Sequence, residues 1–148
     1  YKVVLDAQKQ AISIAKPGVK YSTIDETARN VLAEGLLSLG LLKGSVKKVI
    51  EDGSLRRFYP HGTGHWLGMD VHDVGFYGVS DKQRELKPGM VFTVEPGIYF
   101  QPTDKESPSE YQNIGIRIED DILITENGNE ILTHGVPKEI DEIEALRN

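Results

Sequence analysis

Apolar residues in the first third of the chain recur with the spacing of an α-helix. In residues 1–15 they lie on one helical face, at Val3, Val4, Ala7, Ala11 and Ile14. The pattern ends at Lys16-Pro17-Gly18, where proline and glycine break a helix. No capping residue precedes the pattern. We therefore expect the chain to be a piece of a longer protein, cut just before or inside this helix.

A second helical pattern follows and carries its own start signal. Thr23 and Glu26 have the spacing of a capping box, in which each side chain bonds the backbone amide of the other residue. The apolar stripe behind them consists of Ile24, Ala28, Val31, Leu32 and Leu36. A shorter helix is expected over residues 45–51, ending at Asp52-Gly53. Such amphipathic helices are typical of a layer that covers a sheet.

Residues 58–121 change to a strand pattern with glycine-rich connections. Residues 91–94 (Val-Phe-Thr-Val) follow a Lys87-Pro88-Gly89 turn and predict a β-strand. Residues 114–124 alternate, so Gly115, Arg117 and Glu119 are expected on one face and the isoleucines on the other. The polar residues 101–110 predict a surface loop between these strands. From residue 125 we expect a turn at 126–129, a strand at 130–133 and a charged helix near 138–146.

Length and composition limit the kind of protein. The 148 residues correspond to one ordinary domain, with the 39% hydrophobic and 27% charged content of a globular chain. No apolar run approaches the roughly 20 residues that cross a bilayer, so we expect no membrane partner. The net charge of −6 argues against a nucleic-acid partner, because phosphate binding needs a basic face. The lack of cysteine excludes disulfides and thiol chemistry, and we expect a cytoplasmic location.

A short histidine-rich segment is the first candidate for chemistry. Three of the four histidines fall within it, at His61, His65 and His72. A zinc-binding helix is excluded, because Pro60, Gly62 and Gly64 oppose a helix and no glutamate follows the first histidine directly. Glycines beside a histidine instead indicate a close backbone approach to a bound group. Because imidazole is the commonest metal ligand and proton shuttle, the cluster predicts a metal or catalytic site.

Two glutamates have the chemistry to join such a site. Glu95 ends the apolar 91–94 strand, where a carboxylate is costly to bury unless it is paired or binds a cation. The Pro96-Gly97 that follows turns the chain and fixes where the side chain points. Glu119 is expected on the polar face of the second strand. A ligand set of His65, Glu95 and Glu119 is mostly oxygen, which favours Mn²⁺ or a similar ion, and bridging carboxylates can hold two metals about 3.5–4 Å apart.

Three ordered strings in the chain resemble the Xaa-Pro aminopeptidases (aminopeptidase P), which are pita-bread metallopeptidases. The strings are His61-Gly62-Thr63-Gly64-His65-Trp66-Leu67-Gly68-Met69-Asp70-Val71-His72-Asp73, Val94-Glu95-Pro96-Gly97-Ile98-Tyr99 and Gly115-Ile116-Arg117-Ile118-Glu119-Asp120-Asp121. The resemblance runs over essentially the whole chain. It implies an α+β pita-bread fold, with helices covering a curved antiparallel sheet that is incomplete at its N-terminus. Residues 1–148 would then be the C-terminal part of the catalytic domain.

The resemblance also implies a role for individual residues. His65, Glu95 and Glu119 match metal ligands, and Glu95 also matches the residue that helps to deprotonate the attacking water. His61 and His72 match histidines that contact substrate and stabilise the tetrahedral intermediate. Arg117 and Tyr99 match positions near the metals, where they would orient the ligands. Two residues beside the ligand histidine, Trp66 and Leu67, are expected to pack in the core.

The family's dinuclear site, usually manganese with cobalt or zinc as alternatives, holds two aspartates besides these three ligands. Those aspartates lie on a hairpin upstream of the opening helix, and Asp6 lies inside the helical pattern, so it is not assigned as a ligand. With the hairpin and the family's N-terminal domain absent, we expect this chain alone to bind metal weakly or not at all and to be inactive. The longer protein is expected to be a homo-oligomer that releases the N-terminal residue from peptides with proline in the second position.

Three other functions remain open at this stage. Prolidase, which cleaves Xaa-Pro dipeptides, has a very similar histidine-rich string. A non-catalytic pita-bread binding protein is also conceivable, although such proteins usually replace one or more ligands, and every ligand position within this chain holds a competent residue. Methionine aminopeptidase fits the paired His61 and His72 and the Trp66-Leu67-Gly68 string poorly.

Overall fold

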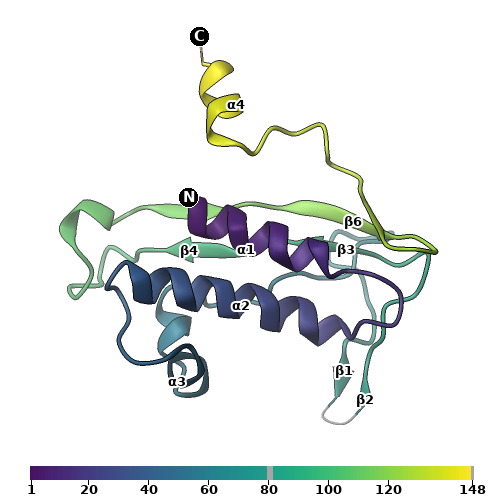
Figure 1. Cartoon of the computed structure of the whole chain (residues 1–148), viewed down its shortest axis with the longest axis horizontal. Helices are drawn as coiled ribbons and strands as arrows, with labels where there is room; N and C mark the ends of the chain where they lie inside the picture. The colour runs from purple at the N-terminus through teal and green to yellow at the C-terminus, as the bar shows by residue number, and fades with distance from the viewer. Residues whose placement is uncertain (80–81, 148) are drawn as a thin grey trace.

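The computed structural model describes residues 1–79 and 82–147, which form helices and short antiparallel strands (Figure 1). The helices are α1 (Lys2–Ser13), α2 (Tyr21–Ser38), α3 (Val46–Glu51) and α4 (Ile140–Ala145), with 3-10 turns η1 (Ser54–Arg57) and η2 (Ser109–Tyr111). The strands are β1 (Gly78–Val79), β2 (Lys82–Gln83), β3 (Val91–Val94), β4 (Gly97–Tyr99), β5 (Gly115–Arg117), β6 (Asp120–Ile124) and β7 (Asn129–Ile131). They pair in the orders β1-β2, β3-β6-β7 and β4-β5, all antiparallel. The expected α+β class is confirmed, and within the described ranges no helix could span a membrane.

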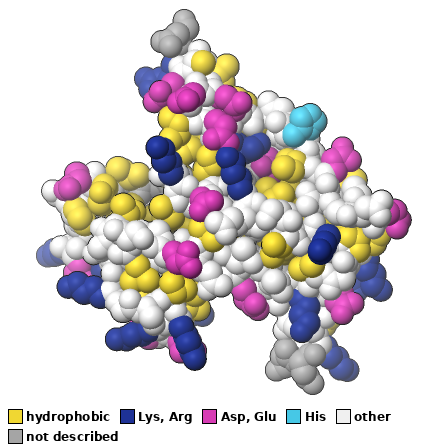
Figure 2. Space-filling model, viewed as in Figure 1, with side chains coloured by type: hydrophobic (Ala, Val, Ile, Leu, Met, Phe, Trp, Pro, Cys, Tyr) yellow, Lys and Arg dark blue, Asp and Glu magenta, His cyan; other side chains and the backbone are white. Residues whose placement is uncertain are grey.

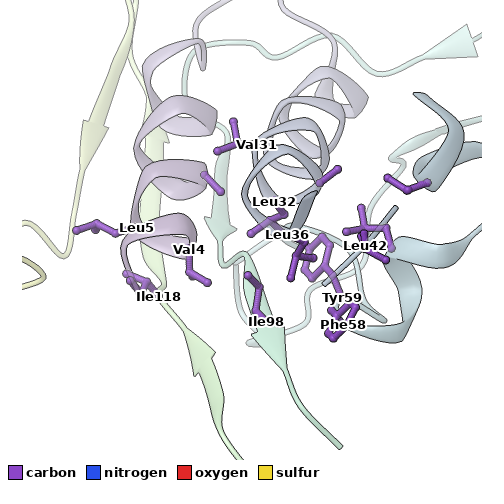
Figure 3. Packing of buried hydrophobic residues seen from close by; sticks show 14 residues of the cluster. Val4, Leu5, Val31, Leu32, Leu36, Leu42, Phe58, Tyr59, Ile98 and Ile118 are labelled. Carbon is purple, nitrogen blue, oxygen red and sulfur yellow. The ribbon is translucent and has the colours of Figure 1, made fainter. Parts of the chain in front are cut away.

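Helices α1 and α2 lie side by side and cover the strands with their apolar faces (Figure 1). A first core cluster joins Val4 and Leu5 of α1 and Leu32 of α2 to Ile98 of β4 and to Ile118, between β5 and β6 (Figure 3). A second cluster continues the core, with Ala11, Ile12, Ala28, Trp66, Phe92 and Ile122 among its members. The predicted apolar stripe of the second helix is therefore confirmed, because all its members are buried. Hydrophobic burial of this kind holds the helical layer on the strands.

The predicted capping box at Thr23 is wrong. Helix α2 begins two residues earlier, at Tyr21, and its N-cap residue Lys20 makes no side-chain capping bond. The Tyr21 N–H instead donates to the Arg84 carbonyl at 2.7 Å, beside an isolated bridge between Lys20 and Glu85. A distant segment thus satisfies an amide of the first turn. The prediction for α3 is confirmed, with Ser45 accepting from the Lys48 amide at 3.3 Å.

The single strand expected over residues 114–124 is divided into β5 and β6. Val94 of β3 lies opposite Asp120, and Gly97 of β4 lies opposite Arg117, so both pairs of strands share one register. The Ile118 N–H donates to the Pro96 carbonyl at 3.3 Å and joins them. The four strands form one long antiparallel ribbon, interrupted where proline offers no N–H to the ladder. Positions 95 and 119 face each other across this interruption.

Side chains along residues 117–122 alternate between the solvent side and the core, and this alternation buries the carboxylate of Asp120. Arg117 and Glu119 share the exposed face, as the predicted alternation requires, whereas Ile118 and Ile122 point into the core together with Asp120, which is 1% exposed; Ile114, expected with the other isoleucines, is 42% exposed. The Asp120 carboxylate accepts hydrogen bonds from Gln8 Nε2 (2.6 Å), Thr133 Oγ1 (2.5 Å) and Lys138 Nζ (2.9 Å). It therefore ties α1 and the segment after β7 to the start of β6, directly after Glu119.

The remaining predictions for the C-terminal half are confirmed with small shifts. Residues 101–110 form a loop between β4 and β5, the last strand is β7, and the C-terminal helix is α4. Figure 1 shows α4 projecting from the helix–strand body. On the face drawn in Figure 2, Lys and Arg side chains are interspersed with Asp, Glu and hydrophobic side chains.

Replacing Asp120 with alanine should destabilise the fold. The change removes the carboxylate that neutralises the mostly buried Lys138 ammonium and accepts from the buried Gln8 amide, a loss of about 3–5 kcal/mol in the free energy of unfolding. Urea denaturation of the chain measures it. Glu130→Ala, on an exposed position of β7, is the control and should change the value by less than about 0.5 kcal/mol. Equal stability of the two variants would contradict the structural role of Asp120.

Candidate metal centre

Three of the predicted side chains converge from three different segments. One donor atom each of His65, Glu95 and Glu119 lie within 4.8 Å of one another. His65 Nε2 is 3.3 Å from Glu95 Oε1, and these two side chains are 16% and 15% exposed. One imidazole nitrogen and two carboxylates at such separations fit the donor set of a hard divalent cation. The chain thus brings the three proposed ligands together, although they are separated by up to 54 positions in the sequence.

The histidine segment lies along the free edge of β3 in an extended conformation. The Glu95 N–H donates to the Thr63 carbonyl at 2.7 Å, and the Thr93 N–H donates to the His65 carbonyl at 2.9 Å. Further along, Trp66 forms an antiparallel bridge with Phe92. The prediction that this segment is not a helix is confirmed. Opposite residues of antiparallel neighbours point to the same face, and this pairing puts His65 opposite Thr93. Thr93 shares its strand face with Glu95, two residues on, so His65 lies on the face that carries Glu95.

Gly64 allows this close pairing. A Cβ atom at Gly64 would lie 1.8 Å from the Thr93 carbonyl oxygen, far inside van der Waals contact. At Gly62, in contrast, an added Cβ would meet no atom within 4 Å. The sequence indicated that these glycines let the backbone approach a bound group. At Gly64 the close approach is to the backbone of β3, because the segment pairs with that strand.

The ring of His65 has a defined orientation. Its Nδ1 lies 3.0 Å from the Trp66 carbonyl oxygen, which can only accept a hydrogen bond. The neutral ring must therefore carry its proton on Nδ1, which leaves the Nε2 lone pair directed toward Glu95. Metal-binding histidines are typically oriented by such a bond from their second nitrogen.

Thr93 connects two of the three candidate ligands and was missed in the sequence. Its hydroxyl accepts from the His65 backbone N–H at 3.0 Å and donates to Glu95 Oε1 at 3.1 Å. The residue is 2% exposed, so neither bond competes with bulk water. A signal was present, because a threonine in an apolar strand two positions before Glu95 lies on the same strand face.

The two glutamates repel each other. Glu119 is exposed as a residue, yet its carboxyl group is partly withdrawn from water, and this burial, followed by the charge of Glu95, raises its pKa above the ordinary value. The guanidinium of Arg117 lies beside the two glutamates, with its Nε 3.8 Å from Glu95 Oε2 and its side chain 52% exposed. One solvated guanidinium compensates two converging carboxylates poorly. A bound cation would relieve this repulsion.

His61, Tyr99 and Arg117 form one directed chain of hydrogen bonds. The Gly62 carbonyl lies 2.8 Å from His61 Nδ1, so that nitrogen donates and His61 Nε2 accepts from the Tyr99 hydroxyl at 2.8 Å. The Tyr99 hydroxyl also bonds Arg117, and this contact is the main cause that raises the pKa of the guanidinium. These three predicted residues therefore lie together beside Glu95.

The structure also places the other predicted residues of the segment. His72 is exposed, and its ring stands edge-on to His65 with centroids 4.3 Å apart. Trp66 is 9% exposed and packs against Tyr21 and Phe92, which confirms its expected core position, while Leu67 is half-buried.

Gly64→Ala should disrupt the centre, because its Cβ would collide with rigid backbone and force the histidine segment off β3. We expect a loss of about 2 kcal/mol or more in the free energy of unfolding and weaker Mn²⁺ binding by the full-length protein. Gly62→Ala is the matched control and should leave both nearly unchanged, since the added methyl group meets open space. Calorimetric titration with Mn²⁺ and urea denaturation give the two values. A Gly64 variant that matches the Gly62 variant in both would contradict the pairing described here.

Comparison with known proteins finds relatives that match over nearly the whole of this chain. The chain is 53% identical over 148 residues to Xaa-Pro aminopeptidase of Haemophilus influenzae, covering all of this chain and 34% of that relative. It is 49% identical over 146 residues to the Escherichia coli Xaa-Pro aminopeptidase, covering 99% of this chain and 33% of that protein. The structure matches Pseudomonas aeruginosa aminopeptidase PepP with a TM-score of 0.94 and 48% identity, over 99% of this chain and 33% of that one.

The chain thus spans about a third of the length of these relatives. Their likeness confirms the pita-bread fold implied by the sequence strings. Residues 1–126 match the description "Metallopeptidase family M24". The chain belongs to this family of metallopeptidases.

Proposed function

We propose that this chain is the C-terminal part of the catalytic domain of a Xaa-Pro aminopeptidase. The longer protein would release the N-terminal residue from peptides with proline in the second position. The observation that carries the proposal is the convergence of His65, Glu95 and Glu119, with the Nε2 lone pair of the histidine directed into the cluster. The relatives named above support the substrate class, since they are Xaa-Pro aminopeptidases.

The three side chains suit two divalent metal ions, with the remaining ligands supplied by the longer protein. The carboxylate-rich donor set favours Mn²⁺, with Co²⁺ or Zn²⁺ as alternatives. One similar solved structure is a zinc-substituted Escherichia coli aminopeptidase P in complex with product. When bound, such metals supply Lewis-acid activation of water for attack on the peptide carbonyl. Because two aspartate ligands are expected from outside this sequence, metal binding by the chain alone should be weak or absent.

The residues around the cluster have separate proposed roles. Glu95 would accept the proton of the attacking water, the role that its match to the aminopeptidase strings implies; its Oε1 is held by Thr93 and its Oε2 lies 3.8 Å from Arg117 Nε. His61 and His72 flank His65 and would contact the substrate around the scissile bond. Arg117 and Tyr99 would orient His61 and Glu95 through the bonds described above. The expected homo-oligomer and cytoplasmic location stay predictions.

Peptide cleavage by the full-length protein tests the function. With Mn²⁺, it should release alanine from Ala-Pro-Ala and not from Ala-Ala-Ala. Glu95→Ala should lower kcat at least about 100-fold, because it removes a ligand and the proposed proton acceptor. Chromatographic detection of the released alanine gives both results.

Glu110→Ala provides the control, since this exposed glutamate lies in η2 and takes no part in the proposed site. It should retain the activity of the unmodified protein. Cleavage of the dipeptide Ala-Pro in preference to the tripeptide would favour prolidase. Full activity of the Glu95 variant would overturn the proposed metallopeptidase function. So would the absence of hydrolysis of both Ala-Pro-Ala and Ala-Pro with each of Mn²⁺, Co²⁺ and Zn²⁺.

A further inference from the structure

The N-terminal half of α2 contacts the histidine segment through two charged side chains. Asp25 and Arg29 lie one helical turn apart and are paired, with Arg29 Nε donating to Asp25 Oδ2 at 2.5 Å. Their side chains are 31% and 23% exposed. None of the sequence strings that indicated the site includes either residue. Both nevertheless bond the segment that carries His61 and His65.

Asp25 and Arg29 hold adjacent parts of that segment. Asp25 Oδ1 accepts from the Thr63 backbone N–H at 2.9 Å and from the Thr63 hydroxyl at 2.8 Å. Arg29 Nη2 donates to the His61 carbonyl at 3.2 Å. The carboxylate and guanidinium of one helix turn thus bind an N–H, a hydroxyl and a carbonyl within three residues. Fixing both donors and acceptors leaves the backbone of His61–Thr63 little freedom to rotate.

The direction of each bond at Thr63 is determined. Since a carboxylate only accepts, the Thr63 hydroxyl donates to Asp25, and it must accept from the Tyr59 hydroxyl, which lies 2.8 Å away. Tyr59 is fully buried, and that burial raises its pKa, which keeps the hydroxyl protonated as a donor. Thr63 is 2% exposed. Removing Asp25 would leave two buried donors of Thr63 without an acceptor, which is costly.

Thr63 transmits this anchoring to a candidate ligand. Its carbonyl accepts the N–H of Glu95 at 2.7 Å. This bond fixes the backbone of Glu95 beyond the end of β3, at the interruption of the ribbon. Gly62 and Gly64 flank Thr63, so without side-chain anchoring this part of the backbone would have unusual freedom. Asp25 therefore acts on Glu95 through one intervening residue.

We propose that Asp25 and Arg29 are positioning residues of the metal centre, which set the places of His61 and Glu95 through Thr63. The proposal rests on the proposed function, because it assumes that Glu95 binds metal. Neither residue touches the reacting atoms. Their loss should therefore weaken metal binding and lower kcat by displacing His61 and Glu95.

Titration of the metal-free full-length protein with Mn²⁺, followed by calorimetry, tests this role. Asp25→Ala should raise the Kd for Mn²⁺ about 10-fold, the lower end of the effect of groups that orient metal ligands. The matched control is Asp104→Ala. Asp104 also pairs with an arginine, Arg57, at 2.6 Å and is 13% exposed, but it lies in the loop after β4. The control should keep the Kd within about twofold, since the two sites share no partner.

Two further variants keep the test informative if Asp25→Ala fails to fold. Thr63→Val removes only the hydroxyl and should raise the Kd several-fold, whereas Thr63→Ser retains that donor and should restore the unmodified value. Mn²⁺ affinity in Asp25→Ala or Thr63→Val equal to that of the Asp104 control would overturn the positioning role. If the unmodified protein binds no Mn²⁺, or Glu95→Ala binds it normally, the proposed function itself fails, and this inference with it.

Discussion

The register shared by the β3–β6 and β4–β5 pairs is the constraint on which the site depends. Antiparallel strands present alternate residues to opposite faces, so a slip of one residue would turn Glu119 into the core and Asp120 toward the site. The core resists such a slip, because Ile118 and Ile122 are buried on the same face. The buried Asp120 adds a polar constraint through its three donors. Packing of the isoleucines on one face of the ribbon thereby determines that Glu119 lies on the other face.

The carboxylates of Glu95 and Glu119 both lie at the interruption of the ribbon. Pro96 cannot donate to the ladder, and the Glu95 amide, like that of Thr93, points away from β6 and bonds the histidine segment at Thr63. Glu95 therefore lies in the ribbon between β3 and β4, and its backbone also bonds the histidine segment. A carboxylate held this way costs little reorganisation when a cation binds, which is the general advantage of a preorganised site.

Helix α2 serves both the core and the site. Its apolar stripe packs on the strands, while Asp25 and Arg29 on another part of its surface bond the histidine segment. The glycine-rich segment has no regular structure of its own and is held between this helix and β3. The position of the proposed ligand His65 therefore depends on these neighbours.

Local signals in the sequence were sufficient for much of this structure. Sequence patterns predicted α1, α3, β3 and β7 and the region of β5 and β6, but not β1, β2 or β4, and the cost of burying Glu95 pointed to a cation site. The predicted start of α2 was wrong. The Arg84 carbonyl, which accepts a hydrogen bond from the first turn of the helix, comes from a segment more than 60 residues away. The roles of Thr93 and Asp25 depend on which strands and helices become neighbours, and periodicity does not contain that information.

Anomalous diffraction from crystals of the full-length protein grown with Mn²⁺ tests the central claim most directly. The account predicts a manganese peak bounded by His65 Nε2 and carboxylate oxygens of Glu95 and Glu119, at distances of about 2.0–2.3 Å. It also predicts that Thr93 remains bonded to the His65 amide. A peak elsewhere, or no peak between these three side chains, would contradict the assignment of the site.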